Sequence, residues 1–234
     1  SWLVAARQDQ EEVWLLEEFL TGREHTFDSV TLGGETIWAS ISDYRPPPLE
    51  VLRTPWVQWT VLLPRDVSGP EYAGIRTAGP AALRALGVTD AFSHMEWFER
   101  PDGSVAISEV GARPPGAQLA SMIGFSYDFD FYATWAELML KGTFQPRERQ
   151  YASGTAYLRG MGHGQVRAVH GIDRLQQQLG HLVVDSRLPQ PGQPASTSYE
   201  GEGFITVRHP DTAVVQEALD TIISTARVEL VESQ

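Results

Sequence analysis

Hydrophobic residues alternate with polar ones in two stretches that flank a turn signal near the middle of the chain. The stretches cover residues 92–99 and 104–113, and a period of two is typical of a half-buried strand. Asp102 and Gly103 stand between them and favour a two-residue hairpin turn, because the central residues of a type I′ turn need positive φ. The pattern therefore predicts a β-hairpin.

A two-residue loop would place Glu96 directly opposite Glu109 on the paired strand. Ionised carboxylates with Cβ atoms about 5 Å apart repel each other unless a cation lies between them or both point to water. Carboxylates combined with phosphate oxygens are a usual environment for Mg²⁺. Arg113 follows Glu109 by four residues on the same face, so two carboxylates and a guanidinium are predicted to converge. A solvated pair of acids is the alternative.

The chain before this hairpin also predicts antiparallel strands. Residues 12–20 are expected to form a strand that ends in an acidic hinge, and residues 1–10 the end of a helix. Residues 24–32 and 35–42 alternate around Gly33 and Gly34, which indicates a second hairpin.

Prolines and aromatic residues dominate the next segment. Residues 43–79 contain six prolines and several Trp and Tyr residues, so we expect an irregular loop packed on the core. A short helix is predicted over residues 80–86, with Pro80 in its first turn, and a longer one over residues 127–141 with an aromatic face. The polar stretch 145–150 is expected to hold a domain boundary.

The last part of the chain combines short strands with helices. Strands are predicted over residues 152–159, 165–170, 181–185, 203–208 and 228–231. Asp173 and Asp211 are expected to cap two helices, the second clearly amphipathic. The predicted fold class is α+β: an antiparallel sheet with helices on one face over residues 1–147, followed by a smaller α/β domain over residues 148–234.

Composition and charge exclude several classes of function. The net charge of -12 argues against a general binder of nucleic acid or anionic membranes. The absence of cysteine excludes disulfides, thiolate metal sites and a Cys nucleophile. No apolar run approaches the roughly 18 residues of a membrane span, and no secretory signal pattern opens the chain. We therefore expect a cytoplasmic protein that binds neither nucleic acid nor membranes, and we allow for a homodimer.

Three segments together resemble the ATP-grasp enzymes. EEFLTGRE, at residues 17–24, is similar to the family's E-x-x-(apolar)-x-G-x-E segment. The sequence HME at residues 94–96, followed by EVGARPPG from Glu109, is similar to the family's two metal-binding acidic strands. The thirteen residues from one acid to the other fit the family, as does the later Arg113. Residues 124–142 resemble the following segment in ligases that join carboxylates to amines, and residues 151–234 more loosely resemble the small C-terminal domain of its amino-acid ligases.

The resemblance implies an ATP site. In the family, the hinge after the first strand binds adenine through its backbone, which here gives Glu17, Glu18 and Leu20. The acid that binds the ribose hydroxyls would be Glu24, since a carboxylate accepts hydrogen bonds from both. Ordinary solvated acids at a strand end are the alternative.

The resemblance also implies a metal site. Glu96 and Glu109 would hold Mg²⁺ or Mn²⁺ against the ATP phosphates, and Arg113 would stabilise charge on the transferring phosphoryl group and on an acyl phosphate. For His94, a hydrogen-bonded structural role is favoured over a phosphate contact. Gly111 departs from the family pattern, because many members have an Asn ligand there.

The implied function is an ATP-dependent ligase that joins a small carboxylate to an amine through an acyl phosphate. A Gly-rich phosphate loop and nucleotide-binding lysines do not precede the hinge, so we expect this chain to be the C-terminal lobe of an ATP-grasp domain from a longer enzyme, and inactive alone. The alternatives are a binding or regulatory module that has lost catalysis, and a metal-binding or structural domain without a nucleotide.

Overall fold

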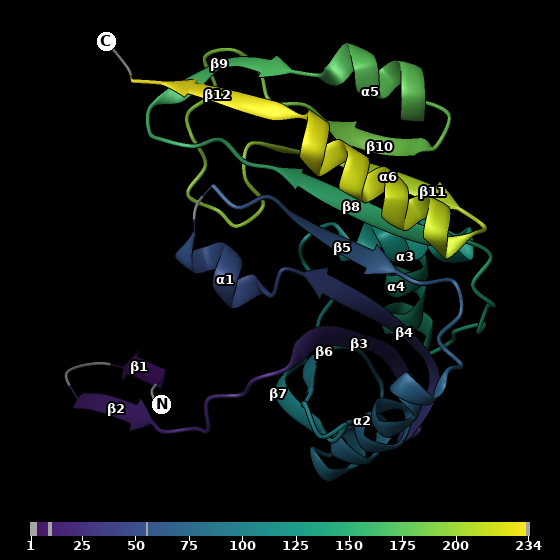
Figure 1. Cartoon of the computed structure of the whole chain (residues 1–234). Helices are drawn as coiled ribbons and strands as arrows, with labels where there is room; N and C mark the ends of the chain where they lie inside the picture. The colour runs from purple at the N-terminus through teal and green to yellow at the C-terminus, as the bar shows by residue number, and fades with distance from the viewer. Residues whose placement is uncertain (1–3, 9–10, 55, 233–234) are drawn as a thin grey trace.

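One antiparallel sheet organises the fold. The structure is a computed structural model that describes residues 4–8, 11–54 and 56–232. In this part of the chain eight strands form the sheet, in the order β10-β11-β8-β5-β4-β3-β6-β7 (Figure 1). The pairs β1-β2 and β9-β12 form two separate small sheets. The predicted α+β class with a large antiparallel sheet is confirmed.

The N-terminal prediction is wrong for the residues that the structure describes. Residues Val4–Gln8 form strand β1, not the end of a helix, and they pair with β2 (Glu11–Leu15). The other residues of the predicted helix, 1–3 and 9–10, lie outside the described part. Strand β2 ends five residues earlier than expected, so residues 16–22 form an irregular connection to the main sheet.

Four strands of the first half follow the predicted alternation. They are β3 (Arg23–Leu32), β4 (Glu35–Arg45), β6 (Ala91–Glu99) and β7 (Val105–Gly111). Gly33 and Gly34 join β3 to β4 with φ of 59° and 83°, which suits a tight hairpin.

The β6–β7 hairpin has a different turn from the one predicted. The Arg100 N–H donates to the Ser104 carbonyl at 2.9 Å, so the loop covers residues 101–103. Of the two expected turn residues, only Gly103 has a positive φ. A three-residue loop ending in a left-handed glycine is the next most common hairpin connection.

A bulge then restores the predicted register. Trp97 faces Ile107, whereas the preceding residue, Glu96, faces Glu109, so Ser108 is an extra residue in β7. The Ser108 hydroxyl donates to the Glu96 carbonyl at 3.1 Å. The two acids therefore face each other as predicted, through a loop and a bulge that the sequence argument did not include.

The segment expected to be an irregular loop contains regular structure. It holds α1 (Pro48–Arg53), strand β5 (Trp59–Leu63), a 3₁₀ turn (Pro70–Tyr72) and the start of α2 (Ala73–Ala85). The prediction failed at β5 because prolines border this fully buried strand without interrupting it. Pro80 lies inside α2 and does not begin it.

Helices cover both faces of the sheet, so the prediction of a single covered face is wrong. Helix α2 packs on Phe27 and Ile41, and α6 (Thr212–Thr225) packs on Leu62 on the same face. Helix α3 (Leu119–Tyr127) packs on Val61 and Leu63 on the other face, where α4 (Phe131–Lys141) follows it (Figure 1).

The helix predicted over residues 127–141 begins later, as α4 at Phe131, and Tyr127 is the last residue of α3, a helix that the sequence argument did not predict. Asp128 adopts the left-handed conformation with φ of 56°, which ends α3. The Asp130 side chain then caps α4 by accepting a hydrogen bond from the Ala133 N–H at 2.9 Å. In α4, Phe131 and Leu138 are buried, whereas Met139 is 58% exposed.

The C-terminal strands extend the same sheet. They are β8 (Ala152–Leu158), β10 (Val183–Arg187) and β11 (Gly203–His209), and β8 pairs with β5 across the position of the expected boundary at 147/148. Strand β9 (Gln165–His170) pairs with β12 (Arg227–Val231). None of the helices in the described ranges is both long and apolar enough to cross a membrane.

One of the two helix caps predicted for this part of the chain is confirmed. Asp211 caps α6 as predicted, accepting from the Ala213 N–H at 2.9 Å. Gly171, with φ of 85°, caps α5 (Ile172–Leu179), so Asp173 lies in the first turn and is not the cap that we expected.

Arg159, at the end of β8, fastens α1 to the sheet. Its side chain is buried and donates to the carbonyls of Val51, Thr54 and Val57 at 2.9, 3.3 and 3.1 Å. A residue of the C-terminal part therefore fixes the position of α1.

We predict that Arg159→Met lowers the free energy of unfolding by about 2 to 4 kcal/mol, because three carbonyls lose a charged donor while most of the apolar stem is kept. Urea denaturation followed by tryptophan fluorescence measures this. The control is Arg174→Met, at an exposed position of α5, with a change below about 0.5 kcal/mol. Equal effects of the two substitutions would contradict the role given to Arg159.

Candidate functional site

A polar stripe crosses one face of the sheet at β3 and β6. Glu24, Thr26 and Asp28 alternate along β3, and each is buried. Glu96 pairs with Thr26 across the ladder, and His94 is the next residue of β6 on this face. Buried carboxylates are costly unless partners compensate their charge.

His94 is the buried cationic partner of this stripe. Its Nδ1 lies 2.7 Å from Asp28 Oδ1, and its Nε2 lies 3.7 Å from Glu96 Oε1. Burial alone lowers the pKa of His94, but hydrogen bonds and charge from Asp28 and Glu96 outweigh it and raise the pKa to about 9. The imidazolium therefore links the two acids at neutral pH, in agreement with the structural role favoured for His94.

Glu24 lies at the open end of the stripe. Its side chain is buried, and this burial, together with the charge of Glu96, raises the pKa of Glu24 to about 7. The Tyr44 hydroxyl on β4 donates to Glu96 Oε1 at 3.4 Å. The carboxyl of Glu24 therefore changes charge near neutral pH, whereas the neighbouring carboxyl of Glu96 is held by Tyr44 and His94.

Arg113 lies next to the facing acids. Its Nη2 is 3.7 Å from Glu109 Oε1, and both side chains are more than half exposed. A Cβ atom at Gly111 would lie 3.4 Å from the Arg113 Cγ and Nε atoms, so the guanidinium arm crosses the glycine. Gly111, the position that departs from the family pattern, therefore lies directly beneath the Arg113 side chain.

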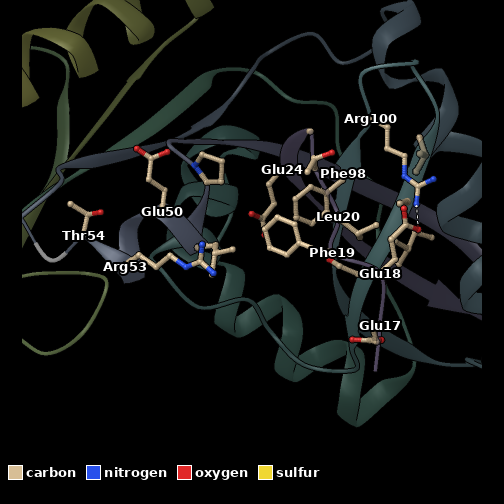
Figure 2. Close-up of a pocket in the computed structure, with 18 residues that line it drawn as sticks. Glu17, Glu18, Phe19, Leu20, Glu24, Glu50, Arg53, Thr54, Phe98 and Arg100 are labelled. Atoms are coloured by element: carbon tan, nitrogen blue, oxygen red, sulfur yellow. Dashed lines mark hydrogen bonds and ion pairs between the residues drawn. The ribbon is translucent and has the colours of Figure 1, made fainter. Parts of the chain in front are cut away.

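A cavity of about 900 Å³ adjoins the stripe at Glu24. Glu17, Glu18 and Leu20 line its wall, so the structure brings the four predicted nucleotide contacts to one cavity (Figure 2). Glu96, Glu109 and Arg113 do not line this cavity.

The other walls of the cavity come from the sheet edge and from α1. Phe98, Ala106 and Ile107 supply an apolar surface, and the exposed Glu18 forms an ion pair with Arg100 at 3.0 Å. Figure 2 shows the side chain of Arg53, which comes from α1, on the opposite side of the cavity from Phe19 and Glu24.

Glu96 and Glu109 fit a divalent cation only if a bound ligand supplies further oxygen atoms to it. Within the described ranges, no group of three or more His, Asp or Glu residues is placed to hold a metal ion. The two facing carboxylates of Glu96 and Glu109 can supply two protein ligands, and Mg²⁺ commonly takes its other ligands from water and phosphate.

Sequence reasoning missed several residues at this site. Asp28 could have been found, because it continues the every-second-residue polar pattern of Glu24 and Thr26. Tyr44, Arg53 and the apolar wall carry no local signal, since they reach the site through the path of β4 and α1.

The comparisons with known proteins identify the fold. No protein-family model and no curated protein matches the sequence. Among solved structures, L-amino acid ligase from Bacillus licheniformis matches with a TM-score of 0.73 and 16% identity, over 99% of this chain and 64% of that one. N5-carboxyaminoimidazole ribonucleotide synthetase from Thermotoga maritima matches with a TM-score of 0.66 and 16% identity, over 96% of this chain and 57% of that one.

A third neighbour was solved with a nucleotide. N5-carboxyaminoimidazole synthase from Aspergillus clavatus, in complex with ADP, has a TM-score of 0.62 and 12% identity, over 93% of this chain and 54% of that one. The neighbours are ATP-grasp enzymes, and this chain has the corresponding part of their fold. It spans between half and two-thirds of the length of these proteins.

We predict that Glu24 makes stability fall as pH rises. Its pKa of about 7 in the folded chain exceeds the ordinary value of 4.5, so the stabilising contribution is complete below pH 4.5 and is lost as pH rises to about 7. Between pH 4.5 and 7.5, the unaltered chain should lose about 2 to 3 kcal/mol more unfolding free energy than Glu24→Gln.

Urea denaturation at several pH values, with EDTA present, tests this. Glu137→Gln on the surface of α4 is the control and should follow the unaltered chain. Parallel pH curves for Glu24→Gln and the unaltered chain would show that the Glu24 carboxyl is not perturbed.

Proposed function

We propose that this chain is the C-terminal part of an ATP-dependent ligase that activates a carboxylate as an acyl phosphate and transfers the acyl group to an amine. The observation that carries the proposal is the facing pair Glu96 and Glu109, with Arg113 at 3.7 Å from Glu109, beside the cavity that Glu24 lines. The fold shared with ligases supports the same reaction class.

In this proposal the cavity holds the adenosine. The apolar side chains of Leu20 and Phe98 would contact the base, and the backbone of residues 17–20 would hydrogen-bond its edge. Glu24 would accept hydrogen bonds from the ribose hydroxyls, for which its carboxylate form suits two donors. In this orientation the phosphates of ATP would extend along β6 toward Glu96.

The acidic pair and Arg113 would bind the phosphate end. When Mg²⁺ or Mn²⁺ is bound by Glu96 and Glu109, the chemistry it supplies is neutralisation of phosphate charge. Arg113 would hold the oxygens that gain negative charge as the phosphoryl group reaches the carboxylate. His94, whose Nε2 lies 3.7 Å from Glu96 Oε1, would help to orient the Glu96 carboxyl.

A binding or regulatory module without catalysis is the second candidate, and one observation favours it. His94 and Arg113 already compensate Glu96 and Glu109, so the acidic pair does not need a metal ion for folding. The two candidates differ in whether the full-length protein consumes ATP.

Formation of a hydroxamate tests the proposed function. Full-length protein containing this chain is incubated with ATP, Mg²⁺ and hydroxylamine, and with each of the common L-amino acids and small carboxylic acids in turn. Hydroxylamine captures an acyl phosphate as a hydroxamate, with release of ADP and phosphate. We expect at least one acid to give hydroxamate and ADP in equal amounts; release of AMP and pyrophosphate, or no turnover with any acid, contradicts the proposal.

We predict that Glu109→Gln lowers turnover in this assay by more than a hundredfold, since it removes a charge from the metal site, while the urea midpoint stays unchanged. Glu137→Gln, on α4, is the matched control and should keep full turnover.

We also predict that Arg113→Ala lowers kcat more than it weakens binding of Mg-ATP, because the charge that Arg113 meets develops mainly in the transition state. Steady-state kinetics, together with calorimetric titration of a non-hydrolysable ATP analogue, separates the two effects. An unchanged kcat would remove Arg113 from the mechanism.

A further inference from the structure

The segment after Arg113 is held by aromatic residues from distant parts of the chain. Ala117 and Gln118 both adopt left-handed backbone conformations, with φ of 49° and 60°, which is uncommon for residues other than glycine. The buried Tyr157 hydroxyl on β8 donates to the Ala117 carbonyl. Trp59 on β5 stacks on Tyr157, with ring centroids 4.2 Å apart.

Tyr199 continues this aromatic group to the edge of the site. It belongs to the connection between β10 and β11, and its carbonyl accepts a hydrogen bond from Trp59 Nε1 at 2.8 Å. Its ring packs edge-on against Trp59 at 5.8 Å. The ring and backbone of Tyr199 are therefore fixed by β5.

The Tyr199 hydroxyl lies against the segment that carries Arg113. A Cβ atom at Gly116 would be 3.4 Å from the Tyr199 Oη atom. Tyr199 is 36% exposed, and the hydrogen bond that it accepts from Trp59 uses its carbonyl and leaves its hydroxyl available. A fixed phenol with an uncommitted hydroxyl is thus placed beside the proposed reaction site.

The surroundings of Tyr199 keep its hydroxyl protonated. Burial and the charge of Glu200 raise the pKa of Tyr199, and of the groups at the reaction site Arg113 lowers it while Glu96 raises it. The phenol therefore keeps its proton at neutral pH and can donate. Neither Tyr199 nor Gly116 lines the cavity assigned to adenosine, so a ligand that contacts this hydroxyl lies outside the adenosine site.

We propose that the Tyr199 hydroxyl donates a hydrogen bond to a carboxylate oxygen of the acyl donor, on the Arg113 side of the acidic pair. This inference rests on the proposed ligase function and adds a substrate contact from the C-terminal part of the chain. A phosphate oxygen of the nucleotide offers the same chemistry, and the two sources differ in which ligand loses affinity when the hydroxyl is removed.

Tyr199→Phe in the full-length protein tests the proposal. The ring stays on Trp59, so the urea midpoint should not change. In the hydroxamate assay, KM for the acid that gives most product should rise about tenfold, the effect of one lost hydrogen bond to a charged group. The calorimetric dissociation constant of the Mg²⁺ complex of a non-hydrolysable ATP analogue should stay within about twofold.

Two further variants sharpen the result. Gly116→Ala should also raise KM for the acid, because its methyl group would fill space beside the Tyr199 hydroxyl that the carboxylate oxygen needs. Tyr132→Phe, on the exposed face of α4, is the matched control and should leave every constant unchanged.

Each contrary result has a distinct meaning. An unchanged KM for the acid in Tyr199→Phe overturns the proposed contact, and so does a loss confined to binding of the ATP analogue, which would assign the hydroxyl to a phosphate. No turnover by the unaltered protein with any acid overturns the ligase function itself, and the Tyr199 contact with it.

Discussion

Repulsion among carboxylates is the constraint on which this site depends. Glu24, Asp28, Glu96 and Glu109 occupy neighbouring positions on three strands, and the first two are buried. His94 lies between Asp28 and Glu96, and Arg113 lies beside Glu109. Glu24 takes up a proton near neutral pH. Cationic partners and protonation therefore reduce the repulsion within the protein itself.

Because the sheet is continuous, residues of the C-terminal part contact the segments that form the site. Strand β8 pairs with β5, so Arg159 can fasten α1, and Tyr157 can hold the backbone after Arg113. Both contacts act on segments that border the cavity or the acidic pair. The geometry of the proposed active site therefore requires residues on both sides of the boundary that the sequence suggested.

The β6–β7 hairpin shows how a sequence argument can reach a correct result through incorrect steps. The Asp-Gly signal located the turn, but a two-residue loop was assumed where the chain uses residues 101–103. The bulge at Ser108 offsets that difference by one residue, so Glu96 still faces Glu109. Bulges are not visible in a period-two pattern, because they depend on how the strand must bend against its neighbours.

The sequence by itself determined the local features: alternating strands β3, β4, β6 and β7, the Asp211 cap, and the order of acidic and basic residues that resembles ATP-grasp enzymes. These follow from short-range periodicity and capping chemistry, which neighbouring residues encode. Only the tertiary structure decided that β5 is a central strand, that helices cover both faces, and that Tyr199 reaches Gly116. Such contacts join residues far apart in the chain, and the packing of the whole sheet selects them.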